Sequence, residues 1–235
     1  MTGPSGGSPI PHPRAAEVAW AVILPVEPFS HAKAGFAPVT GYRRGELAHA
    51  LFLDTLRAVR ATECVGLVVV ATGDPLAARQ ARTLGAVTAE APPRSGLNTA
   101  VRHGAALVAS LAPTAAVAAL TTDLPTLRPS ELRRALSAAG AHPRAFVSDR
   151  NSGSTTVLTA CSPDRLAPSF GSGSRLRHTR GGAHELAIPG IVGLRLDVDT
   201  PGDLIAARLR GLGPYTSAIL STWEATRPAL SAHAR

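Results

Sequence analysis

The 235-residue chain is 45% hydrophobic and carries a formal net charge of +8. This length supports one sizeable core, and no apolar run reaches the roughly 18 residues that suggest a membrane-spanning helix. The two cysteines, Cys64 and Cys161, form no CxxC pair, which gives no zinc signature and favours a reducing, cytoplasmic location. Arginine supplies 23 of the 24 basic residues, but these are dispersed and not interleaved with aromatic residues, so nucleic acid is the least expected partner.

Composition divides the chain into three parts. Residues 1–16 are rich in Gly, Pro and Ser and lack the apolar segment of a signal peptide, so a disordered leader is expected. Residues 17–213 contain the apolar and amphipathic segments of one domain. The tail, residues 214–235, is partly apolar, and we expect it to form a helix that packs on the core or on a second subunit of a homodimer.

The first elements of the domain are a buried strand and an amphipathic helix. Residues 18–24 form a continuous apolar run closed by Pro25, which is typical of a strand buried on both faces. Residues 26–41 contain several glycines and prolines and predict a long loop, which directly after a first strand is often functional. Residues 44–60 carry apolar side chains at i, i+3, i+4 spacing and predict a helix with one buried face.

Strands and helices alternate along the rest of the domain. Further strands are expected at residues 66–71, 86–89, 115–120, 144–148, 155–160 and 190–196. Further helices are expected at about 76–84, from 97, at 129–139 and at 201–210, and residues 162–183 are expected to be irregular. This alternation predicts a single-domain α/β fold with a mostly parallel mixed sheet flanked by helices. Open sheets of this kind bind ligands beyond the carboxyl ends of their strands.

Three aspartates follow apolar runs. Asp197 and Asp199 occupy alternate positions, so in a strand both side chains project from one face, roughly 7 Å apart. Asp123 follows the run at 115–120 and would supply a third carboxylate. Two carboxylates about 4 Å apart repel by roughly 4 kcal/mol at an effective dielectric near 20, and a divalent cation removes this repulsion. The pattern predicts an all-oxygen Mg²⁺ site of the kind that handles phosphates. Alternatively, Asp123 and Asp199 cap the helices that follow them.

Three other features could contact a phosphate or a nucleotide. Lys33 is the only lysine, and its compact ammonium group could neutralise a triphosphate beside a metal site, although it could equally be an ordinary surface residue. The amide of Asn98 could read a base or ribose, or could cap a helix. Residues 171–175, Gly-Ser-Gly-Ser-Arg, could form an anion-binding nest or a flexible loop. The chain has no Walker A loop and no GxGxxG after a strand.

A set of short motifs, taken together, resembles a known enzyme family. The motifs are Leu24-Pro25-Val26, Ala32-Lys33, Leu53-Asp54-Thr55-Leu56, Leu97-Asn98, Asp123-Leu124-Pro125, Phe170-Gly171-Ser172-Gly173-Ser174 and Asp197-Val198-Asp199-Thr200-Pro201. Their order and spacing resemble the guanylyltransferases of coenzyme F-420 biosynthesis, which act on phosphoenolpyruvate or 2-phospho-L-lactate. The chain is most similar to the actinobacterial phosphoenolpyruvate type, and the resemblance covers roughly residues 18–214.

The resemblance implies a Rossmann-like, GT-A-like nucleotidyltransferase fold. It also implies Mg²⁺-dependent transfer of GMP from GTP to a small phosphorylated carboxylic acid, with release of pyrophosphate. The implied metal ligands are Asp123, Asp197 and Asp199, and the implied catalytic residues are Lys33 and Asp123. The implied nucleotide contacts are Pro25, Lys33 and Asn98, and the implied acceptor contacts are Thr155, Gly171 and Ser174.

The chain departs from the family pattern at three places, one of which is the altered glycine-threonine pair near residue 153. Glu27 stands where the family usually has Lys, and Ala34-Gly35-Phe36 stands where Ser-Arg-Leu or Thr-Arg-Leu usually follows the lysine that matches Lys33. Two basic groups are thus missing from the rim expected to bind anions. Besides guanylyl transfer to a phospho acid, two other functions are considered. One is sugar-nucleotide formation or another transfer to a different acceptor, such as a sugar phosphate or phosphoglycerate, and the other is non-catalytic nucleotide binding.

Overall fold

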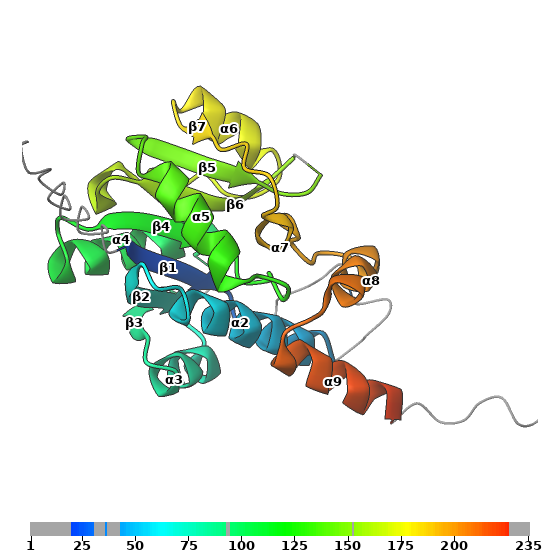
Figure 1. Ribbon diagram of the computed structural model, residues 1–235. Coiled ribbons are helices and arrows are strands. Elements are labelled where there is room, and N and C mark those ends of the chain that lie inside the picture. The colour runs from blue at the N-terminus through cyan, green and yellow to red at the C-terminus, as the bar shows by residue number, and fades with distance from the viewer. Residues whose placement is uncertain (1–19, 31–35, 37–42, 93–94, 152, 226–235) are drawn as a thin grey trace, which may run out of the picture.

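A computed structural model describes residues 20–30, 36, 43–92, 95–151 and 153–225 (Figure 1). Lys33 and the leader expected at residues 1–16 lie outside the described residues, as does most of the loop expected at 26–41. Among the helices in the described ranges, none combines the length and the apolar character needed to cross a bilayer.

The described residues include a seven-stranded sheet in the order β3-β2-β1-β4-β6-β5-β7. Its strands are β1 (Trp20–Val26), β2 (Val65–Thr72), β3 (Val87–Glu90), β4 (Ala116–Leu120), β5 (Arg144–Ser148), β6 (Thr155–Ala160) and β7 (His184–Glu185). Strand β1 runs parallel to β2 and β4, whereas β6 runs antiparallel to β4 and β5. The expected mostly parallel, mixed sheet is confirmed. Because β6 is reversed, its first residues lie at the same edge as the carboxyl ends of β1 and β4.

Helices cover both faces of the sheet. They are α2 (Arg44–Arg60), α3 (Pro75–Thr83), α4 (Leu97–Leu111), α5 (Pro129–Ala139), the 3-10 turn η3 (Pro163–Arg165), α6 (Ser174–Arg180), α7 (Val192–Arg195), α8 (Pro201–Arg210) and α9 (Pro214–Ala225). Figure 1 shows α2 and α5 in front of the strands and α4 behind them. Along β1, Val22 and Leu24 belong to the apolar cluster that includes α2, while Ile23 between them belongs to the cluster that includes α4. This alternation places a core on each face of β1.

The prediction of a strand at residues 190–196 is wrong. Helix α7 occupies Val192–Arg195, and β7 forms the edge of the sheet instead. The two buried residues Ile191 and Leu194 are three positions apart, which is helical spacing. A short apolar run does not by itself distinguish a buried strand from a buried helix, so this segment was open to either structure.

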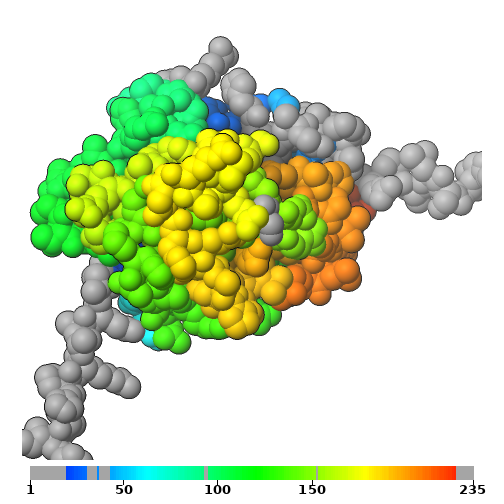
Figure 2. Space-filling view, turned by 90° about the horizontal axis from the view of Figure 1, so that it is seen from above, coloured from blue at the N-terminus to red at the C-terminus, as the bar shows by residue number. Residues whose placement is uncertain are grey.

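Helix α6 lies within residues 162–183, which were expected to be irregular. The helix is polar and rich in arginine, and only Ser174 and His178 are buried, so the sequence offers no apolar stripe to indicate a helix. The glycine before it, Gly173, adopts the left-handed conformation with φ of 73°, which favours glycine over other residues. In Figure 2, seen from above, α6 and β7 (yellow) cover the middle of the molecule and the α7–α8 region (orange) lies beside them.

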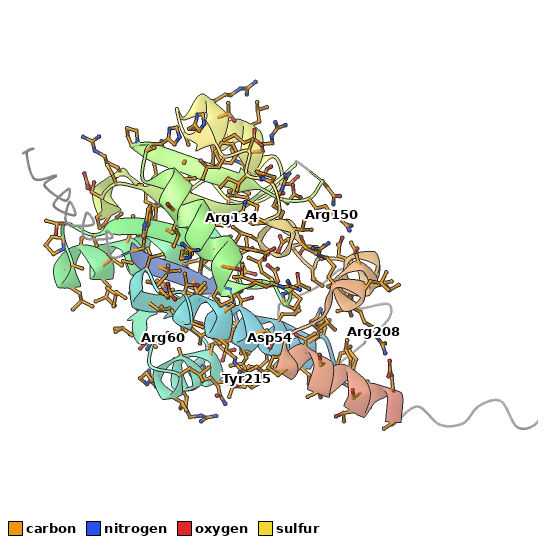
Figure 3. The ribbon with its side chains drawn as sticks, viewed as in Figure 1. Asp54, Arg60, Arg134, Arg150, Arg208 and Tyr215 are labelled. Atoms are coloured by element: carbon orange, nitrogen blue, oxygen red, sulfur yellow. The ribbon has the colours of Figure 1, made fainter. Side chains whose placement is uncertain are left out.

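Two adjacent polar residues of α2 anchor the chain near Asp123. The buried carboxylate of Asp54 accepts hydrogen bonds from the backbone N–H groups of Tyr215 (3.0 Å) and Thr216 (2.8 Å), at the start of α9 (Figure 3). Burial raises the pKa of Asp54, and the hydrogen bonds from Thr216 and Tyr215 oppose that rise. The next residue, Thr55, accepts a hydrogen bond from the Leu124 N–H at 3.0 Å. Helix α2 therefore fixes both α9 and the backbone that follows Asp123.

Gly213→Ala tests the packing of α9 on Asp54. A Cβ at position 213 would overlap the Cγ and Oδ1 atoms of Asp54, so the α9 anchor must shift. We expect the free energy of unfolding to fall by about 1–3 kcal/mol, measured by urea denaturation. The control is Gly202→Ala in α8, whose Cβ would meet nothing nearer than Thr200 Oγ1 at 3.7 Å and whose stability should be unchanged or slightly higher. Equal responses of the two variants would contradict the anchor.

Candidate functional site

A cleft of about 500 Å³ lies at the edge of the sheet where β1 and β4 end and the reversed β6 begins. Pro25 and Val26 line it at the end of β1, and Asp123 lines it beyond β4. Thr155, the first residue of β6, lines it from the other side. The reversal of β6 explains how a residue from the start of a strand reaches a site formed by strand ends. The cleft thus lies where open α/β sheets bind ligands.

Three carboxylates meet at this cleft. Asp123, Asp197 and Asp199 each present an oxygen within 4.8 Å of the others. Residues 197–199 are not in a strand, yet they alternate as a strand would, because Val198 is fully buried between the two acids. The Val198 N–H donates to the Asp123 carbonyl at 3.1 Å, which ties the two acidic segments together. The Thr121 hydroxyl donates to Asp197 Oδ1 at 3.4 Å.

The alternative, that Asp123 and Asp199 cap helices, is not observed. The N-cap of α8 is Thr200, whose hydroxyl accepts from the Asp203 N–H. The N-cap of α5 is Arg128, whose backbone N–H donates to Glu131 Oε2 at 3.1 Å. The acids are therefore not needed to cap the N-terminus of either helix. Three convergent carboxylates form a hard, all-oxygen donor set, and such a set fits Mg²⁺.

In the same cleft, the Thr155 hydroxyl contacts a buried histidine. Thr155 Oγ1 lies 2.9 Å from His178 Nδ1, and the Ser169 N–H donates to His178 Nε2 at 3.0 Å. Burial, with the nearby guanidinium groups of Arg144 and Arg177, lowers the pKa of His178 to about 4, so the imidazole is neutral near pH 7. His178 was not predicted from the sequence, because its segment carries no apolar pattern and Thr155 lies 23 residues away.

Asn98 holds the loop that leads into α6. Its Nδ2 donates to the Phe170 carbonyl at 3.2 Å, and its Oδ1 accepts from the Phe170 N–H at 2.7 Å. It does not cap α4, whose N-cap is Gly96. The contact with Phe170 gives Asn98 a structural role that the sequence did not reveal. A nucleotide contact by its second amide hydrogen stays a prediction.

The loop at residues 169–173 presents its backbone to the cleft. The Arg177 guanidinium donates to the carbonyls of Ser169, Phe170 and Ser172. Gly171 and Ser172 line the cleft, and their N–H groups donate to no acceptor in the described part of the chain. Gly171 has φ of 106°, which favours glycine. Successive unpaired N–H groups of this kind form an anion-binding nest.

The predicted acceptor and nucleotide contacts occupy different positions around the cleft. Thr155 and Gly171 line it, whereas Ser174 is fully buried at the start of α6 and donates its N–H to the Gly171 carbonyl at 2.9 Å. Pro25 lines both the cleft and a second pocket of about 220 Å³ beside it. Glu27 is exposed and lines both spaces, so this acid does face the site.

Solved structures of nucleotidyltransferases share this fold. A putative nucleotide-diphospho-sugar transferase from Desulfovibrio desulfuricans G20 superposes with a TM-score of 0.65 at 16% identity, covering 88% of this chain and 96% of that one. A nucleotidyl transferase from Methanothermobacter thermautotroptrophicus superposes with a TM-score of 0.53 at 17% identity, covering 88% and 100%. At these identities the likeness establishes the fold, and the expected nucleotidyltransferase fold is confirmed.

Sequence relatives establish the family. The chain is 45% identical to a phosphoenolpyruvate guanylyltransferase from Thermomonospora curvata, over 91% of this chain and 93% of that protein. It is 48% identical to a protein of the same name from Streptomyces scabiei, over 85% of this chain and 94% of the relative. The profile of the family described as guanylyl transferase CofC like matches residues 20–226. The chain therefore belongs to the CofC-like guanylyl transferase family of enzymes, as its motifs predict.

Proposed function

We propose that the protein transfers GMP from GTP to a small phosphorylated carboxylic acid, phosphoenolpyruvate or 2-phospho-L-lactate, in coenzyme F-420 biosynthesis. The observation that carries the proposal is the convergence of Asp123, Asp197 and Asp199 on a cleft that Thr155 and the nest at Gly171 also line. The names of the relatives support phosphoenolpyruvate as the acceptor. In the reaction, an acceptor phosphate oxygen attacks the α-phosphorus of GTP, the bond from that phosphorus to the bridging oxygen breaks, and pyrophosphate leaves.

The carboxylates and the neutral donors of the cleft have different roles in this proposal. Asp123, Asp197 and Asp199 would hold Mg²⁺, which when bound supplies charge neutralisation at the α-phosphate and the leaving pyrophosphate. The Thr155 hydroxyl and the Gly171 N–H would donate to the anionic groups of the acceptor. The chain then acts by positioning the two substrates, and the reaction needs no covalent nucleophile.

The second pocket suits the nucleotide base. Its walls include Pro25, Ala91, Pro92 and Leu97, which are apolar, together with Gly96 at the start of α4. Apolar walls with a few backbone polar groups are typical of a nucleobase site. Pro25 and Asn98 would then contact the nucleotide, and Lys33, which lies outside the described residues, would contact its phosphates.

Asp197→Asn tests the metal site by two independent measurements. With GTP, Mg²⁺ and phosphoenolpyruvate, we expect pyrophosphate release to fall by a factor on the order of 100 or more, because one charged ligand is lost. In EDTA, we expect the free energy of unfolding to rise by about 1 kcal/mol, because one repelling charge is removed. The amide retains an oxygen that can accept from Thr121, so the local hydrogen bond is preserved.

Glu63→Gln is the matched control for this variant. Glu63 is exposed and precedes β2, at the opposite edge of the sheet. Its substitution should change neither pyrophosphate release nor stability in EDTA. Full activity of Asp197→Asn, or wild-type activity unaffected by EDTA, would contradict the metal site. Absence of turnover with either phospho acid would contradict the proposed substrates.

Glu27 favours a second candidate, namely a family member with a different acceptor or with no turnover. Its carboxylate lies at the rim where anionic substrates enter. Glu27→Lys should lower the KM for GTP or for the phospho acid by about three- to tenfold, because exposed charges contribute at most about 1 kcal/mol each. Glu63→Lys changes the net charge equally away from the cleft and should leave both KM values unchanged. If Glu27→Lys has no effect on either KM, the acid does not limit anion binding.

A further inference from the structure

We infer that His178 is a positioning residue, which directs the hydroxyl proton of Thr155 into the cleft and so makes this hydroxyl a donor to the acceptor's anionic group. The inference rests on the proposed function for the identity of the acceptor. The tautomer of the ring, the direction left to the hydroxyl proton, the packing of the ring and the surrounding charges all favour this role.

The hydrogen bonds of the ring fix its tautomer. The Ser169 backbone N–H is a donor only, so His178 Nε2, 3.0 Å away, must be the acceptor. A neutral imidazole then carries its proton on Nδ1, which donates to Thr155 Oγ1 at 2.9 Å. The low pKa of His178, about 4, keeps the ring neutral near pH 7, so this arrangement persists under ordinary conditions.

The Thr155 hydroxyl must point its own proton elsewhere. Because its oxygen accepts from His178, its proton is available to a different acceptor. No second partner for this hydroxyl is found among the described residues, and the side chain lines the cleft. A ligand oxygen in the cleft is therefore the natural acceptor. With any other tautomer the hydroxyl would donate to the ring and would offer a bound anion only its lone pairs.

The imidazole cannot rotate away from Thr155 without disturbing the core. Its side chain is 1% exposed and packs against Phe146 of β5, with ring centroids 5.9 Å apart, and edge-on against Phe170, at 5.4 Å. Phe170 is held in turn by Asn98. The ring thus joins β6 to the loop that lines the cleft.

The charges near the ring favour the same arrangement. Arg144 lies on β5 and Arg177 lies on α6, and both oppose protonation of His178. Both guanidinium groups donate to backbone carbonyls, Arg144 to Gly181 and Arg177 to Ser169, and therefore stay in place. A protonated ring would lose its acceptor at Nε2 and release the Ser169 N–H.

A matched pair of variants separates the two hydrogen bonds. In His178→Asn the amide N–H groups stand near the position of Nδ1 and can still donate to Thr155, whereas in His178→Gln the carbonyl oxygen stands near Nε2 and can accept only from Ser169. We measure the Kd for phosphoenolpyruvate by calorimetry in the presence of Mg²⁺, together with the KM values and kcat. We expect His178→Gln to raise this Kd about tenfold or more with the KM for GTP little changed, and His178→Asn to bind more tightly than His178→Gln.

A double-mutant cycle adds a readout that a merely structural role would not produce. Thr155→Val removes the hydroxyl, so combining it with His178→Gln should weaken binding no further than Thr155→Val alone. The tautomer itself is measured on wild-type protein from the imidazole ¹⁵N shifts of His178, which need neither turnover nor a folded variant. Protonation at Nε2, equal losses in the Asn and Gln variants, or multiplicative losses in the double variant would each overturn the inference.

The outcomes also distinguish the inference from the proposed function. Wild-type protein that binds phosphoenolpyruvate but releases no pyrophosphate would contradict guanylyl transfer and leave the inference standing if the Gln variant binds weakly. An active wild type whose Gln variant binds phosphoenolpyruvate normally would overturn the inference alone. Wild-type protein that binds neither phosphoenolpyruvate nor 2-phospho-L-lactate would overturn both.

Discussion

The site depends on holding three carboxylates together against their mutual repulsion. Asp123, Asp197 and Asp199 bring oxygens within 4.8 Å of one another, so other groups must supply the energy that keeps them there. Burial of Val198 and its N–H bond to the Asp123 carbonyl supply part of it. Thr55 supplies another part by accepting the Leu124 N–H. These hydrogen bonds are made by the backbone near the acids. The anchors therefore leave the carboxylate groups themselves available.

The reversed strand β6 determines what faces the acids. An all-parallel sheet would place only strand ends at this edge, whereas the antiparallel pairing of β6 with β4 brings in the first residue of a strand, Thr155. The loop from residue 169 to α6 lines the same cleft and is held by Asn98 and Arg177, which hydrogen-bond to its backbone. The cleft therefore combines a cluster of carboxylates with neutral O–H and N–H donors. This combination suits a reaction in which a cation and an anion must lie side by side.

The sequence was most informative where one local pattern decides the structure. Helix α2 begins and ends as expected, but the expectation of one buried face was wrong, because residues 50–56 are all buried and the helix packs into two apolar clusters. Asp197 and Asp199 were expected on a strand, but residues 197–199 do not form one. The two acids still share one side of the chain, as predicted, because side chains also alternate along an extended segment outside a sheet. The contacts of Asn98 and His178 were missed because their partners lie 72 and 23 residues away and are set by the tertiary fold. Lys33 remains a prediction, since it lies outside the described residues.

In this arginine-rich chain, Arg177 influences the cleft through the backbone of the loop that lines it. Arg177 does not line the cleft but donates to three loop carbonyls, among them that of Phe170, which shares a peptide unit with the Gly171 N–H, so Arg177 helps to fix the direction of this N–H. Neutral donors attract an anion less strongly than a guanidinium would, but they are directional, and a misplaced oxygen gains nothing from them. Under the proposed function, discrimination among small acids would depend on the direction of a few N–H and O–H bonds. These directions are set by groups buried behind the surface, and a lysine or arginine at the rim would add affinity without adding that selectivity.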